Sequence, residues 1–119
     1  MEMKNHSFAK RCRYACRGLV SAFRHEASFR TQVVLGLGVL LFLLWLQPPL
    51  VWAALVVVMV ALVLAAELFN TALEHLVDGL HPEEAGFVRV AKDCAAAAVL
   101  VFSVGAVVVF LLMLRAVWG

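Results

Sequence analysis

The sequence predicts an all-α integral membrane protein, in which one surface helix precedes three membrane-spanning helices. Of its 119 residues, 65% are hydrophobic, whereas soluble domains are nearer about half apolar. The apolar residues gather into three runs, each close to the ~20 residues that a helix needs to cross the hydrocarbon core. The length accommodates a single domain over residues 1–119.

The amino-terminal segment has the periodicity of an amphipathic helix. Apolar side chains recur at spacings of three or four residues, at Phe8, Cys12, Ala15, Leu19 and Phe23. Basic side chains line another face, at Lys10, Arg13, Arg17 and Arg24. This pattern predicts a helix over about residues 6–25 that lies in the membrane interface, with its basic side toward the headgroups. Taken alone, the pattern leaves open whether the helix is only an anchor or part of a site.

Three spans are predicted, over about residues 28–47, 50–77 and 88–117. Backbone groups in lipid must be hydrogen-bonded within the chain, so each span is expected to be helical. The first two spans are separated by the sequence Gln47-Pro48-Pro49, because two prolines cannot continue a helix. The polar segment Asp78 to Gly86 separates the second and third spans.

The distribution of basic residues predicts the orientation. Seven of the ten Lys and Arg residues precede the first apolar run, and Arg89 and Lys92 follow the second. Because basic loops stay cytoplasmic, the amino terminus is expected inside and the Pro-Pro turn outside. Aromatic residues agree, since tryptophans favour the interface and Trp45, Trp52 and Trp118 all fall at the predicted outer one.

Polar residues interrupt the end of the second span. Glu67, Asn70, Glu74 and Asp78 are spaced three, four and four residues apart, so a helix places them on one face. A charge at membrane depth costs at least ~2.5 kcal/mol. A helix end whose acids reach solvent explains Asp78 and Glu74, but Glu67 lies among apolar neighbours. A functional role for Glu67 is therefore favoured over a structural one.

Further charged residues are predicted at the same membrane depth. Lys92 and Asp93 begin the third span, and Glu26 precedes the first. Individually, Lys92 could extend toward the interface and Asp93 could be a helix-start anion. Together with the stripe on the second span they form a plausible site for a divalent cation and phosphates, because carboxylates are hard oxygen ligands of Mg²⁺. Neither a Walker A sequence nor GxGxxG occurs, so a nucleotide would be held in another way.

Three segments together resemble a known family. They are "ELFNTALEHLVD" (67–78), "AKDCAAAAVL" (91–100) and "HEASFR" (25–30). In order and spacing they are similar to the prokaryotic diacylglycerol kinase and undecaprenol kinase family. The resemblance implies a homotrimer of three-span subunits in the bacterial cytoplasmic membrane, with active sites shared between neighbours. It also implies transfer of the γ-phosphate of MgATP to a lipid alcohol.

The resemblance implies a role for each matching residue. Glu67 corresponds to the general base, and Glu26 and Glu74 to the carboxylates that bind Mg²⁺. The residues implied around the nucleotide and its phosphates are Asn70, Asp78, Lys92, Asp93, Tyr14 and Glu83. The residues implied at the lipid substrate are Phe29, Arg30 and Ala96.

One departure from the family pattern concerns the cytoplasmic loop. Many members have Glu-Tyr-His where this chain reads Glu83-Glu84-Ala85. A nucleotide contact through that Tyr or His is therefore lost or moved. The segment before the first span is closer to the undecaprenol kinase branch, which shifts the choice of lipid only weakly, and diacylglycerol and undecaprenol both stay open.

Two non-enzymatic functions compete with a kinase. A proton-coupled transporter subunit could use an intramembrane acid such as Glu67 as a relay, and a scaffold would need no chemistry. A transporter should carry polar groups across the whole bilayer. Ser103, however, is the only polar residue in the predicted outer half of the spans. A scaffold leaves the shared depth of Glu26, Glu74 and Lys92 unexplained. No basic stripe with interleaved aromatics occurs beyond the first segment, which argues against a nucleic-acid partner.

Overall fold

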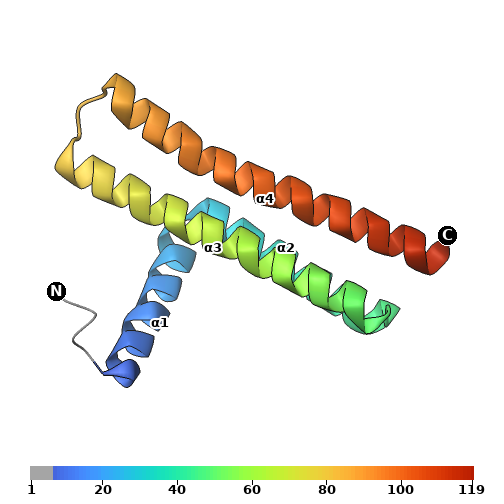
Figure 1. Cartoon of the computed structure of the whole chain (residues 1–119). Helices are drawn as coiled ribbons and strands as arrows, with labels where there is room; N and C mark the ends of the chain where they lie inside the picture. Colours follow the sequence, from blue (N-terminus) through green and yellow to red (C-terminus); the bar gives the residue numbers. More distant parts are fainter. Residues whose placement is uncertain (1–6) are drawn as a thin grey trace.

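The structure, a computed structural model, describes residues 7–119 and folds them into four α-helices (Figure 1). They are α1 (Phe8–His25), α2 (Ala27–Leu46), α3 (Leu50–Leu80) and α4 (Gly86–Trp118). The all-helical fold predicted from the sequence is therefore confirmed. The predicted start of the first helix, at residue 6, lies outside the described residues.

Three of the helices have the length and composition of membrane spans. α2 has 20 residues, α3 has 31 and α4 has 33, and all three are strongly apolar. Since 20 helical residues extend about 30 Å, the thickness of a hydrocarbon core, α3 and α4 are long enough to project beyond it. The prediction of a transmembrane protein is confirmed at this level. The additional length matters because Glu74 and Asp78 lie in it, more than 20 residues from the start of α3, whereas Glu67 lies within the first 20 residues.

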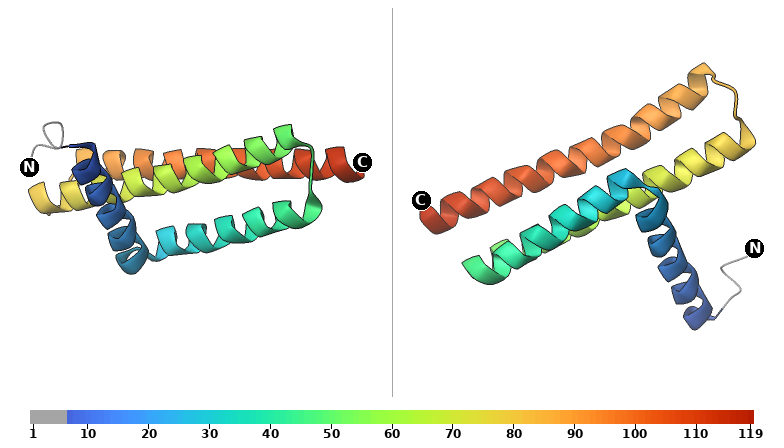
Figure 2. Two further views of the ribbon diagram at one scale, coloured as in Figure 1. Left: turned by 90° about the horizontal axis from the view of Figure 1, so that it is seen from below. Right: turned by 180° about the vertical axis from the view of Figure 1, so that it is seen from behind.

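The helices are organised around α3, which contacts each of the other three. α3 and α4 form a long antiparallel pair, and α2 runs back along α3 from the Pro-Pro turn (Figures 1 and 2). α1 leaves this layer at a steep angle. The angle arises at Glu26, whose extended backbone (φ −116°, ψ 106°) separates α1 from α2.

The turn between α2 and α3 follows from its residues. Gln47 ends α2 in the left-handed region at φ 52°, and its N–H donates to the Leu43 carbonyl. Pro49 then precedes α3, where a proline needs no N–H partner. The chain thus reverses direction within three residues, which aligns α2 with α3 from the turn as far as Glu67.

An apolar cluster holds the three long helices together near this turn. Leu43 of α2, Val56 of α3 and Met113 of α4 form its buried centre, and the Met113 side chain is 0% exposed. Close approach of α2 to α3 depends on Gly36, where an added Cβ would lie 2.9 Å from Cγ1 of Val60. Small residues at helix crossings favour this kind of packing in membranes.

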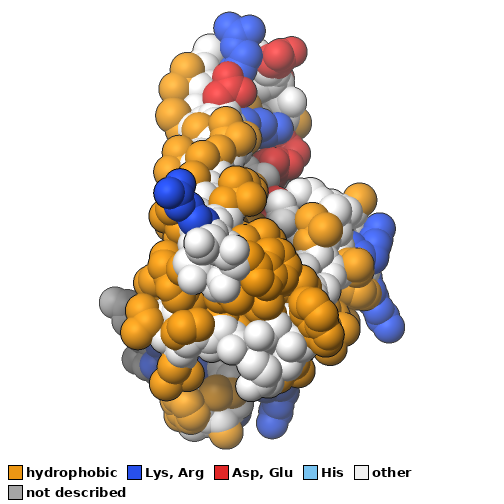
Figure 3. Space-filling model, turned by 90° about the vertical axis from the view of Figure 1, so that its right-hand side faces the viewer, with side chains coloured by type: hydrophobic (Ala, Val, Ile, Leu, Met, Phe, Trp, Pro, Cys, Tyr) orange, Lys and Arg blue, Asp and Glu red, His pale blue; other side chains and the backbone are white. Residues whose placement is uncertain are grey.

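The surface of the chain is divided between apolar and charged regions. Large apolar side chains are exposed along all three long helices, which suits contact with lipid or with other subunits. In Figure 3 apolar side chains cover much of the visible face, whereas acidic side chains gather toward the top, where α3 and α4 approach their connecting loop. The charged end of the α3–α4 pair is therefore the place to look for chemistry.

Candidate active site

Glu67 is a buried carboxylate in the middle of α3. Its side chain is only 4% exposed, and it is the one charged residue among the buried residues of the described chain. The hydroxyl of Ser28, in the first turn of α2, lies 2.9 Å from both Glu67 Oε1 and Glu67 Oε2. The sequence predicted a special role for Glu67 but missed Ser28, because the contact joins residues 39 positions apart.

The next turns of α3 carry a second polar pair. Asn70 Nδ2 donates a hydrogen bond of 2.9 Å to Glu74 Oε1, as the four-residue spacing of the two side chains permits. The Asn70 Oδ1 atom is buried and has no hydrogen-bond partner within residues 7–119. Because a buried carbonyl oxygen is normally paired, this atom marks a place for a donor from outside the chain.

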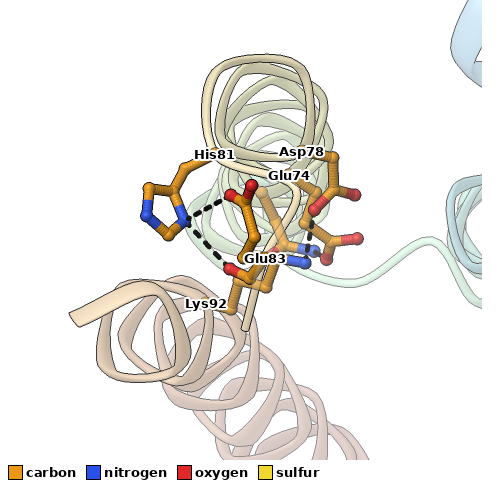
Figure 4. Close-up of polar contacts among 6 residues, drawn as sticks. Glu74, Asp78, His81, Glu83 and Lys92 are labelled. Atoms are coloured by element: carbon orange, nitrogen blue, oxygen red, sulfur yellow. Dashed lines mark hydrogen bonds and ion pairs between the residues drawn. The ribbon is translucent and has the colours of Figure 1, made fainter. Parts of the chain in front are cut away.

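At the end of α3 an ion pair connects it to α4. Lys92 Nζ lies 2.7 Å from Asp78 Oδ1. The two side chains are 36% and 61% exposed, so the pair reaches solvent. Figure 4 shows Glu74 and Asp78 on the same side of α3, facing the Lys92 side chain of α4. The stripe predicted from spacing therefore faces α4 at this end, whereas Asp93 is exposed outside the pair.

Glu26 is tied to α3 by a histidine. Glu26 Oε1 lies 3.2 Å from Nε2 of His75, the residue after Glu74. The His75 side chain is 71% exposed, so this contact lies at the surface. Its contact with Glu26 could not be predicted, since it depends on how α1 and α2 meet beside α3.

The residues implied at the nucleotide on α1 and in the loop lie in separate surroundings. On α1, the Arg17 guanidinium lies over the Tyr14 ring at 5.4 Å. In the α3–α4 loop, His81 Nδ1 lies 2.9 Å from the carbonyl oxygen of Glu83 and 3.7 Å from its Oε2 (Figure 4).

The residues implied at the lipid differ in accessibility. Phe29 is buried. Arg30 Nη1 donates to the carbonyl oxygens of Phe23 and Arg24, at 2.7 and 3.2 Å, and so binds the end of α1. Ala96 is exposed on α4. Of these three, Ala96 is exposed within one chain, Phe29 is buried, and Arg30 joins α2 to the end of α1.

The carboxylates of the site are spread along α3 and the α1–α2 junction, and in the described part of the chain they do not form a cluster of metal ligands. Within residues 7–119 no group of three or more His, Cys, Asp or Glu side chains is arranged to hold a metal ion. Mg²⁺, however, usually takes only one or two carboxylates, and phosphates and water complete its shell. Two carboxylates could serve such a Mg²⁺ ion. Glu74 has one oxygen hydrogen-bonded to Asn70, and Glu26 contacts His75, the residue after Glu74.

Taken together, the geometry places a buried carboxylate and a solvent-exposed ion pair on the same helix. Glu67 can accept a proton at membrane depth. Eleven residues further along α3, about 16 Å at 1.5 Å per residue, Asp78 holds the Lys92 ammonium in solvent. An apolar alcohol can approach the first group from lipid, and a charged phosphate can approach the second from water.

Comparison with known proteins identifies the family. The model of the prokaryotic diacylglycerol kinase family matches residues 13–114. Diacylglycerol kinase of Escherichia coli (strain K12) is 32% identical over 106 residues, 89% of this chain and 87% of the relative. Undecaprenol kinase of Bacillus subtilis (strain 168) is 29% identical over 118 residues, 95% of this chain and 96% of the relative. A diacylglycerol kinase of Synechocystis sp. is 37% identical over 100 residues, 82% of this chain and 56% of the relative. The chain therefore belongs to the prokaryotic diacylglycerol kinase family.

Proposed function

We propose that this protein transfers the γ-phosphate of MgATP to the hydroxyl of a membrane lipid alcohol, at the cytoplasmic face of the bacterial inner membrane. The observation that carries the proposal is the buried Glu67 carboxylate, 4% exposed, on the same helix as the solvated Asp78–Lys92 pair. Membership in the family supports a lipid kinase. A carboxylate in the apolar part of the helix could receive the lipid hydroxyl, and a cation at the surface could receive the phosphates of ATP. This placement supports the proposed reaction.

Each residue has a defined part in the transfer. Glu67 takes the proton of the lipid hydroxyl as its oxygen forms a bond to the γ-phosphorus. The bond from that phosphorus to the bridging oxygen breaks, and ADP leaves. Lys92 offsets negative charge on the phosphates, and the Asn70 amide orients Glu74. Such transfer depends mainly on positioning and charge stabilisation.

Glu74 and Glu26 are proposed to hold Mg²⁺ together with the phosphates. When bound, the ion neutralises phosphate charge and fixes the γ-phosphate for in-line attack. Asp93, Tyr14 and Glu83 are assigned to the nucleotide by family resemblance. Asp93 directly follows Lys92 on α4, whereas Tyr14 lies on α1 and Glu83 in the α3–α4 loop.

Assembly and orientation complete the proposal. A homotrimer with sites shared between subunits is proposed from the family resemblance, and the large apolar side chains exposed on all three long helices are compatible with contacts between subunits. A cytoplasmic amino terminus is supported by the seven basic residues that precede the first span. α1 is proposed to lie on that surface, since its angle to the three long helices suits a helix in the interface plane (Figure 2).

The lipid is either diacylglycerol or undecaprenol, since relatives named for both substrates match most of this chain. The test is transfer of radiolabelled γ-phosphate from MgATP by purified protein in mixed micelles, with the two lipids assayed side by side. Label in one lipid establishes the kinase and identifies its acceptor. Label in neither, with folded protein and Mg²⁺ present, contradicts the proposal and favours the alternative in which Glu67 relays protons.

A further inference from the structure

The buried carboxylate of Glu67 receives fewer hydrogen bonds than its oxygens can accept. An ionised carboxylate offers about four lone-pair positions, and an unpaired buried charge is costly. Within residues 7–119 the Ser28 hydroxyl is the only hydrogen-bond donor to Glu67, and it lies at the same 2.9 Å from each oxygen. One hydroxyl proton can satisfy only one oxygen fully at a time. The other oxygen is left to accept a hydrogen bond from outside the chain.

We propose that Ser28 is the positioning residue of the Glu67 base. Its hydroxyl holds the carboxylate in the orientation in which one oxygen meets the lipid hydroxyl, and it stays bonded to the carboxyl group before and after proton transfer. This inference rests on the proposed kinase function, because it assigns a second residue to that same base.

The chemistry of a hydroxyl explains why serine suits this position. Serine both donates and accepts hydrogen bonds. While Glu67 is ionised, Ser28 donates to one carboxylate oxygen. Once Glu67 has taken the proton of the lipid hydroxyl, Ser28 can continue to donate to the unprotonated oxygen or can accept from the new O–H. The carboxyl group therefore needs no rotation between its two states, and preorganisation of this kind is a large part of catalysis.

The location of Ser28 in the fold supports the same role. It is the second residue of α2, next to the Glu26 linker, so the carboxylate of Glu67 lies at the amino-terminal end of that helix. Unpaired N–H groups in a first helical turn favour nearby negative charge. The adjacent Phe29 is buried at 3% exposure, which fixes this turn against its neighbours. Ser28 is thus held on a rigid element, as a positioning residue requires.

Steady-state kinetics of lipid phosphorylation test the inference. We expect Ser28→Ala to lower kcat by at least about tenfold, the loss that follows from one hydrogen bond to a charged group. The KM for the lipid should stay within about twofold, because the hydroxyl acts on the base and not on lipid binding. Ser28→Thr, which keeps the hydroxyl, should recover most of kcat. Ser21→Ala, which removes an exposed hydroxyl from α1, is the matched control and should match the wild type.

An infrared measurement keeps the test independent of turnover. The difference spectrum between wild type and Glu67→Gln isolates the bands of the Glu67 carboxyl group, and loss of a donor in Ser28→Ala should shift them. Unchanged bands, an unchanged kcat, or a raised KM at constant kcat would each overturn the positioning role. Absence of activity in the wild type would instead contradict the kinase proposal, and the infrared bands would still report the Ser28–Glu67 contact.

Discussion

The two ends of α3 join its neighbours in different ways. Near the Pro-Pro turn, Val56 packs between Leu43 of α2 and Met113 of α4, and the contacts are entirely apolar. Beyond the middle of the helix, α3 is linked by single polar contacts, from Glu67 to Ser28 of α2 and from Asp78 to Lys92 of α4.

The difference separates stability from chemistry. Lipid tails are themselves apolar, so moving an apolar side chain from lipid into a helix interface yields little free energy. The apolar end of α3 is therefore held by close packing of complementary shapes. The polar end carries charged groups that are costly at membrane depth, and packing does not require them. Their presence therefore indicates a functional role. The comparison therefore predicts that substitutions at the polar end reduce phosphate transfer at constant stability, whereas substitutions at the apolar end do the reverse.

The largest effect is expected at Glu67. Glu67→Gln keeps the size of the side chain and removes the base, so phosphate transfer to lipid should fall by about 10²–10⁴-fold, the usual contribution of a general base. Helicity and oligomeric state should be unchanged, as measured by circular dichroism and light scattering in micelles. Turnover at the wild-type rate would remove Glu67 from the mechanism.

The next-largest effect on phosphate transfer is expected at Lys92. Lys92→Met removes the charge near the phosphates and should lower kcat/KM for MgATP by about 10–100-fold, the cost of a lost hydrogen bond to a charged group. Stability should fall by less than about 1 kcal/mol, because the pair with Asp78 is exposed to solvent. Arg89→Met removes another cation of α4 and is the control; equal losses in both variants would argue against a specific role for Lys92.

Glu74 is expected to affect the requirement for metal. Glu74→Ala should raise the Mg²⁺ concentration for half-maximal activity by at least about tenfold, the loss typical even of an outer-shell partner. A Mg²⁺ titration at fixed ATP measures it. The matched control is Glu84→Ala, which removes an exposed carboxylate from the loop. A titration curve that coincides with the wild type would exclude Glu74 as a ligand.

The smallest effect on phosphate transfer is expected at the apolar end. Met113→Ala removes a side chain that is 0% exposed and should lower the free energy of unfolding by about 2 kcal/mol. The rate per folded molecule should remain that of the wild type. Leu111→Ala, at an exposed position of the same helix, should change stability less; a larger effect there would place the important packing at a subunit interface.

The sequence predicts some of these features better than others. The three long helices follow from apolar runs and prolines, α1 follows from the spacing of its apolar side chains, and the polar stripe follows from spacing along α3. All of these are properties of contiguous residues. The Ser28–Glu67 and Glu26–His75 contacts join residues 39 and 49 positions apart. They depend on where α2 begins beside α3, which is set by the three-residue turn at Gln47 and by the extended backbone at Glu26. Neither of these two contacts can therefore be predicted from a local sequence pattern.

The division between the two ends of α3 is tested most directly by one assay. Transfer of labelled phosphate from MgATP to lipid is measured for Glu67→Gln and Met113→Ala in the same micelles, per molecule of folded protein. Glu67→Gln is expected to give background label, and Met113→Ala is expected to give wild-type label. Equal losses in both variants, or full activity of Glu67→Gln, would contradict this division.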